Sequence, residues 1–127
     1  MADPTSLPGV DEHQPIPTKN TRAAIQDLVL EDLGYCVNFA PDVRDGMAAD
    51  IQARKQVGLE RYGTLLQAFN GRDALLDAYQ EALDLCVYLR QVLEEQVRGE
   101  HRGVFYAAYS DALQVALKLR REMSKRG

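Results

Sequence analysis

The sequence feature that most constrains the fold is a broadly apolar helical pattern, which Asp73 is predicted to cap and which runs to about Val97. At about 100° per residue, its apolar side chains spread over about 200° of the helix surface. They are Leu75, Ala78, Tyr79, Ala82, Leu83, Leu85, Cys86, Val87, Leu89 and Leu93. A helix that is apolar over so wide an arc packs against neighbours on two sides. The pattern therefore predicts a central helix in an all-α fold.

Three further helical patterns accompany it. Thr21 is predicted to cap a helix that Gly34 ends, Asp42 to cap a helix over about 43–59, and a last helix is predicted over about 104–123. Four helices in about 107 residues form a thin bundle with a limited core. Because three short partners cannot cover so wide an apolar arc, we predict a four-helix bundle assembled as an intertwined homodimer.

Composition distinguishes an N-terminal tail from a helical domain and argues against several classes of function. Residues 1–20 contain four of the five prolines, which predicts a flexible tail before a single helical domain at 21–124. The net charge of −4 argues against duplex nucleic acid as a partner. No apolar run approaches the roughly 20 residues of a membrane span. The N-terminus lacks the pattern of a secretory signal, which favours a cytoplasmic protein.

Three carboxylates form a stripe along the central helix. Asp77, Glu81 and Asp84 recur at i, i+4 and i+7, a spacing that places them on one side of a helix. The stripe lies opposite the apolar arc, where any soluble helix carries its charges. Tyr88 falls in the same stripe and favours a binding site, because a fully solvated face has little use for an aromatic ring.

The preceding helix carries charges on its apolar side. Asp50, Arg54 and Arg61 project within the same arc as Met47 and Ile51. Charged groups in such positions need partners or water. Two interpretations follow: a ligand site, or an Asp50–Arg54 ion pair at the edge of the core.

The segment GLERYGTLLQAFNGRDALLDAYQEALDLCVYLRQ, residues 58–91, resembles small phage- and prophage-associated proteins of the MazG-like, all-α nucleoside triphosphate pyrophosphohydrolases. The shared motifs are Arg61-Tyr62-Gly63, the turn Asn70-Gly71-Arg72-Asp73, and the pair Glu81…Asp84 before an aliphatic-Tyr-Leu run. The resemblance covers residues 43–93. It implies a helical bundle, commonly a dimer or a dimer of dimers, that converts nucleoside triphosphates to monophosphates and pyrophosphate with Mg²⁺.

The resemblance also implies roles for single residues. Glu81 and Asp84 match the second acidic pair of the family and are the expected catalytic residues. With Asp50 they are the expected ligands of Mg²⁺, or alternatively Mn²⁺, because hard cations prefer oxygen. The EExxE cluster of the family is absent.

The remaining expected roles concern the nucleotide. Positive charge next to the leaving pyrophosphate stabilises its developing negative charge. The residues expected to bind phosphate are Arg54, Lys55 and Arg61, and those expected to face the base or sugar are Tyr62, Asn70 and Tyr88.

Two other functions fit the same residues. The chain can bind and sequester a nucleotide without hydrolysing it, since several Arg and Lys side chains suit the capture of an anion. It can also be a structural or protein-binding bundle, which the clean amphipathic pattern of residues 104–123 favours.

Overall fold

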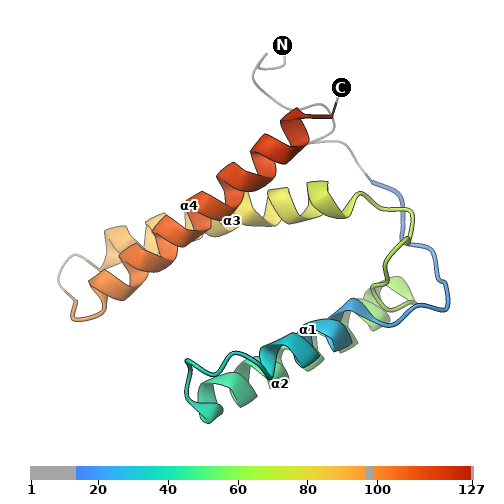
Figure 1. Ribbon diagram of the computed structural model, residues 1–127, viewed down its shortest axis with the longest axis horizontal. Coiled ribbons are helices and arrows are strands. Elements are labelled where there is room, and N and C mark those ends of the chain that lie inside the picture. Colours follow the sequence, from blue (N-terminus) through green and yellow to red (C-terminus); the bar gives the residue numbers. More distant parts are fainter. Residues whose placement is uncertain (1–13, 97–98, 127) are drawn as a thin grey trace. The chain divides into compact units, whose positions relative to one another are not determined.

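The computed structural model describes residues 14–96 and 99–126. In this part of the chain there are four helices and no strand (Figure 1): α1 (Ile25–Leu33), α2 (Pro41–Tyr62), α3 (Ala74–Glu95) and α4 (Arg102–Ser124). The predicted all-α class is therefore confirmed. No helix among the described residues is both long enough and apolar enough to cross a membrane.

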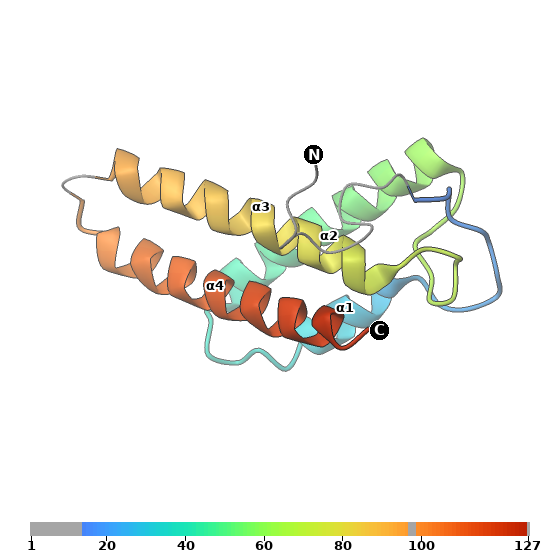
Figure 2. The same ribbon diagram turned by 90° about the horizontal axis from the view of Figure 1, so that it is seen from above.

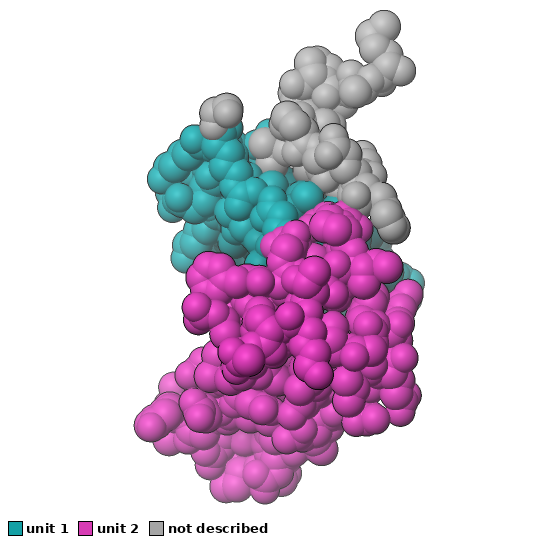
Figure 3. Space-filling view, turned by 90° about the vertical axis from the view of Figure 1, so that its right-hand side faces the viewer, with its two compact units in different colours: residues 1–13, 73–127 teal, residues 14–72 magenta. Residues whose placement is uncertain are grey.

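The helices pair within two compact units, coloured separately in Figure 3. The α1–α2 unit spans residues 14–72, and the α3–α4 unit is described over residues 73–96 and 99–126. In each unit two helices lie side by side (Figure 2). The sequence had predicted one helical domain, and each unit is described by itself below.

The α3–α4 unit has a small core built partly from alanine. Its buried apolar residues are Leu76, Ala82 and Leu93 on α3 and Ala112, Ala116 and Met123 on α4. Small side chains at a contact allow two helices to approach closely, because the side chains there set the distance between the axes. This core lies along the contact between α3 and α4.

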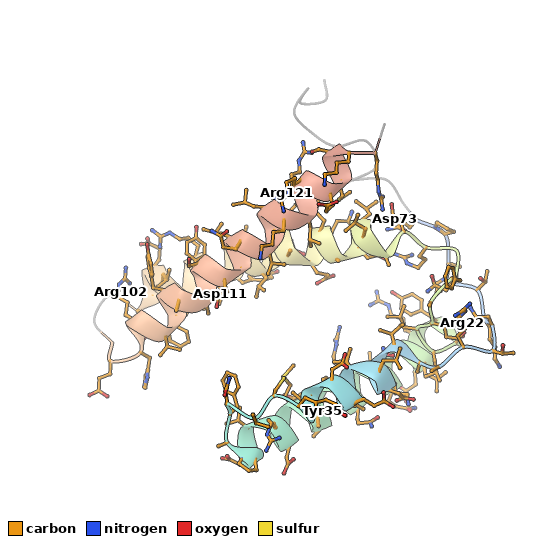
Figure 4. The ribbon with its side chains drawn as sticks, in the orientation of Figure 1. Arg22, Tyr35, Asp73, Arg102, Asp111 and Arg121 are labelled. Carbon is orange, nitrogen blue, oxygen red and sulfur yellow. The ribbon has the colours of Figure 1, made fainter. Side chains whose placement is uncertain are left out.

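Asp73 caps α3, as the sequence predicted. Its carboxylate accepts a hydrogen bond from the amide of Leu76 at 3.1 Å. Asp73, labelled in Figure 4, also receives two hydrogen bonds from Arg126, which follows α4, at 2.6 and 3.2 Å. The hydrogen bond from Arg126 is the main reason that the pKa of Asp73 lies below its usual value. The stability contributed by the Asp73–Arg126 pair is therefore lost only as the pH falls through the lowered pKa of Asp73.

The α1–α2 unit has no buried residue on either helix. Its buried positions instead lie before α1 and in the connection that follows α2. Ala24, Gln67 and Asn70 are 4%, 8% and 6% exposed. The amide of Ile25 donates to the carbonyl of Leu66 at 2.8 Å, which fixes the first turn of α1 on this connection.

One glutamine side chain holds the two segments together. Oε1 of Gln67 accepts from the amide of Asn20 at 3.0 Å. Its Nε2 donates to the carbonyls of Asn20 and Arg22 at 2.8 and 2.7 Å. We call these three hydrogen bonds the Gln67 clamp. They provide partners for the nearly buried side-chain amide of Gln67 and for three backbone groups. Without partners, these buried polar groups would lower the stability of the folded state.

The connection turns sharply around Asn70, where the sequence predicted a turn. Gly71 has a φ of 86° and Phe69 a φ of 57°. The left-handed conformation is ordinary for glycine but costs about 1–2 kcal/mol for other residues. Arg22 is labelled in Figure 4. Its guanidinium lies 4.4 Å from the centroid of the Phe69 ring, in reach of a cation–π contact.

Two predicted helix starts are wrong. Thr21 does not cap α1, because the Gln67 clamp holds residues 20–22 on the connection and the helix begins only at Ile25, after Ala24. Asp42 does not cap α2, because Pro41 already occupies the first turn after Ala40. The fixed φ of proline suits that position.

The tail predicted over residues 1–20 falls partly on the described chain. Residues 1–13 lie outside the described residues. The amide of Thr18 donates to the carbonyl of Asn70 at 2.8 Å, and the guanidinium of Arg72 donates to the carbonyl of Pro15 at 2.8 Å. Pro15, Thr18 and Asn20 therefore have hydrogen-bond partners in the α1–α2 unit.

The Gln67 clamp predicts that Gln67→Leu strongly lowers the stability of the α1–α2 unit. The substitution removes all three hydrogen bonds and should destabilise the α1–α2 unit by about 2–3 kcal/mol. The amide of Ile25, which Gln67 does not contact directly, should then exchange its hydrogen about 30-fold faster or more. Exchange measured by NMR tests this expectation. Gln52→Leu, at an exposed position of α2, is the matched control, and equal exchange in the two variants would contradict the role of the clamp.

Candidate functional site

The predicted site residues fall in both units. The α1–α2 unit contains Asp50, Arg54, Lys55, Arg61, Tyr62 and Asn70, and the α3–α4 unit contains Glu81, Asp84 and Tyr88. A metal site that combines Asp50 with Glu81 and Asp84 thus draws on both units, and its assembly stays a prediction.

An open pocket of about 450 Å³ lies between α1 and α2. Its apolar wall residues are Ile25, Val29, Met47, Ile51 and Leu66. Three polar side chains also line it: Gln26, Asp50 and Arg54. A concave, mostly apolar surface with a few polar groups is the usual character of a small-molecule site. Asp50 and Arg54 therefore lie beside Met47 and Ile51, as the helical spacing predicts.

Asp50 and Arg54 do not form the ion pair that was the alternative interpretation. Within the described residues, neither side chain has a hydrogen-bond or ion-pair partner. Residues four apart on a helix are near enough to pair. Two opposite charges on the pocket wall are thus both available to a ligand.

Gln26 is a pocket residue that the sequence analysis did not identify. Its Oε1 is buried and has no hydrogen-bond partner among residues 14–96 and 99–126. An acceptor in that state costs about 1–3 kcal/mol, and a ligand that supplied a donor would remove this cost. Nothing in the spacing distinguishes Gln26 from an ordinary surface glutamine, because its burial depends on the pairing of α1 with α2.

Lys55 has a partner within the unit. Its Nζ lies 2.8 Å from Oδ1 of Asp27, so the side chain joins α2 to α1 next to the pocket. The other predicted cation, Arg61, lies outside the pocket lining, with its guanidinium 5.6 Å from the centroid of the Tyr62 ring. The phosphate-binding roles of Lys55 and Arg61 stay predictions.

Asn70 serves the connection itself. Its side chain is nearly buried, and its Oδ1 accepts from the amide of Arg72 at 3.1 Å. Tyr62 and Tyr88 are 50% and 63% exposed. Neither tyrosine lines the pocket between α1 and α2.

Glu81 and Asp84 are exposed on α3. In residues 14–96 and 99–126, no three His, Cys, Asp or Glu side chains gather into a group that could hold a metal ion. Mg²⁺ is commonly held by one or two carboxylates together with substrate phosphates and water. The role of Glu81 and Asp84 as a two-carboxylate Mg²⁺ site stays a prediction.

A second open pocket, of about 430 Å³, lies on the α3–α4 unit and is lined partly by Cys86, Arg90, Glu94 and Tyr109. Its charged residues pair with each other, since Arg90 lies 2.5 Å from Glu94. The α1–α2 pocket differs in having two unpaired charges and an unpaired acceptor.

Comparison with known proteins gives no assignment: the chain matches no protein-family model, no curated protein and no solved structure. The MazG-like resemblance therefore stands on the motifs in residues 58–91 alone.

The unpaired state of Arg54 predicts that Arg54→Gln leaves the stability unchanged within about 0.5 kcal/mol, as for a surface substitution that breaks no contact. Lys55→Gln is the matched comparison, because it removes the ion pair with Asp27 and should cost up to about 1 kcal/mol. Urea denaturation of both variants measures the difference. A loss of stability in Arg54→Gln larger than that in Lys55→Gln would show that Arg54 is a structural ion-pair residue after all.

Proposed function

We propose that the chain is a nucleotide-binding protein of the all-α nucleoside triphosphate pyrophosphohydrolase type. The observation that carries the proposal is the α1–α2 pocket, where unpaired Asp50 and Arg54 border an apolar wall. A nucleotide has matching chemistry, with a flat ring at one end and anionic phosphates at the other. The motifs around Arg61, Asn70 and Glu81 support the same class.

The proposed reaction is hydrolysis of a nucleoside triphosphate at its α-phosphorus. A water oxygen forms the new bond to the α-phosphorus and loses a proton to the solvent. The bond from the α-phosphorus to the α–β bridging oxygen breaks with its electron pair on that oxygen, and the monophosphate and pyrophosphate are released. Glu81 and Asp84 would hold Mg²⁺ or Mn²⁺, which when bound would neutralise phosphate charge. Arg54 and Arg61 would offset the negative charge on the departing pyrophosphate.

The proposal includes assembly as a bundle and a homodimer in the cytoplasm. Exposed apolar side chains of the α1–α2 unit support the homodimer: Leu28, Val43 and Val57 are 43%, 55% and 48% exposed. Large exposed apolar patches usually mark an interaction surface. A second copy of the chain would cover them.

Sequestration of a nucleotide without hydrolysis is the second candidate. It is favoured by the sequence, which lacks the EExxE cluster and carries several Arg and Lys side chains suited to binding an anion. Arg54 then serves to bind phosphate, and no metal is required. Nucleotide binding is common to both candidates, so turnover separates them.

The hydrolytic proposal predicts that Glu81→Gln lowers Mg²⁺-dependent pyrophosphate release by about 100-fold or more, because the metal loses a charged ligand. The helix should persist, since Glu81 is exposed. Glu95→Gln, the same change at an exposed position of α3, is the control and should keep full activity.

The assay is release of pyrophosphate from a panel of nucleoside triphosphates with Mg²⁺ or Mn²⁺, with circular dichroism as the folding check. Unchanged release by Glu81→Gln would refute the assignment. Tight nucleotide binding by the wild type without release would instead favour sequestration, and the absence of both would favour a structural bundle.

A further inference from the structure

We propose that the α1–α2 pocket receives the nucleobase, and that Gln26 Oε1 accepts a hydrogen bond from an N–H group on the edge of the base. This inference deepens the proposed function and rests on its nucleotide-binding part, but not on hydrolysis. It moves the base site away from Tyr62, Asn70 and Tyr88, where the motifs had placed it.

The pocket has the size and surface that a base requires. Its volume of about 450 Å³ lies within the range of about 300–1,000 Å³ of ordinary ligand sites. Aliphatic side chains of Ile25, Val29 and Ile51 can cover the faces of a flat ring, which removes apolar surface from water. A purely apolar ligand would not use the polar part of the wall.

Gln26 is the uncharged polar residue in the lining, and it supplies the recognition step. Its unpaired oxygen gains a partner if the side-chain amide turns towards a ring N–H, a rotation about a broad and soft torsion. All the common bases carry at least one N–H donor on their pairing edge. The pocket is therefore expected to accept several bases, with Gln26 requiring a donor and not a particular ring.

Arg54 sets the orientation of the ligand. It lines the same pocket without an ion-pair partner among the described residues. A base held by Gln26 would leave its 5′-phosphate for Arg54, since a guanidinium pairs well with phosphate oxygens. Asp50 is the carboxylate on that wall, which suits a metal or a second donor.

The composition of the chain permits a direct NMR test. The full sequence has three isoleucines and three methionines, so the methyl groups of these residues give few signals. Ile25, Ile51 and Met47 line the pocket. Ile16, which is 73% exposed, and Met123, which is buried in the α3–α4 unit, serve as internal controls.

Full-length protein is titrated without Mg²⁺ with thymidine 5′-monophosphate and, as the matched probe, its N3-methyl derivative, which lacks the ring N–H. The pocket methyls should shift on titration and the two control methyls should not. The N3-methyl derivative should bind the wild type about fivefold more weakly, the value of one neutral hydrogen bond. Gln26→Met should remove this difference, and Gln52→Met should keep it.

A second comparison tests the orientation. Arg54→Gln should weaken the monophosphate about tenfold, as expected for a bond to a charged group, while thymidine itself binds as before. The methyl spectrum of each free variant shows whether its fold is kept. If Gln26→Met does not fold, the two probes on the wild type still decide.

Absence of shifts at Ile25, Ile51 and Met47 would overturn the inference, as would equal affinity of the wild type for the two probes. Pyrophosphate release without these shifts would leave the proposed hydrolysis standing and place the base elsewhere. Shifts without release would support the base pocket and refute hydrolysis.

Discussion

The three hydrogen bonds of Gln67 are the interaction on which the α1–α2 unit most depends. They tie residues 20–22 to the connection after α2, more than forty positions along the chain. Because residues 20–22 are fixed there, Ile25 can donate to Leu66 and α1 begins beside the connection. Ile25, Gln26 and Leu66 thereby come to line one pocket. A buried polar contact, not an apolar core, therefore shapes the candidate site, since neither helix of this unit has a buried residue.

The charges around the pocket divide into structural and available groups. Lys55 is neutralised by Asp27, and that pair links the two helices. One position before it, Arg54 has no such partner within the described residues, and neither does Asp50. Neighbouring cations on one helix thus have different tasks, because a step of one residue turns the side chain by about 100°. The available pair, with the unsatisfied oxygen of Gln26, gives the pocket its proposed affinity for a ligand with both polar and apolar parts.

Local patterns predicted the helices and two residues that line the α1–α2 pocket. The 3.6-residue period placed Asp50 and Arg54 on the side of Met47 and Ile51, where the pocket lies, and Asp73 was recognised as a cap from its position before an apolar pattern. Thr21 was wrongly predicted to cap α1 and Gln26 was not identified as a pocket residue, both for one reason. Their environments are set by hydrogen bonds and helix pairing between segments far apart in the sequence, which a local pattern does not contain. The Asp50–Glu81–Asp84 metal site stays a prediction, since those carboxylates belong to different units.

The central claim is that a nucleotide binds with its base in the α1–α2 pocket. The most direct test is the measurement of intermolecular NOEs between thymidine 5′-monophosphate and methyl-labelled full-length protein. NOEs are expected from the ring protons to the methyls of Val29 and Ile51, which line the pocket. NOEs from the ring only to methyls of the α3–α4 unit, such as those of Leu85 or Val87, would contradict it.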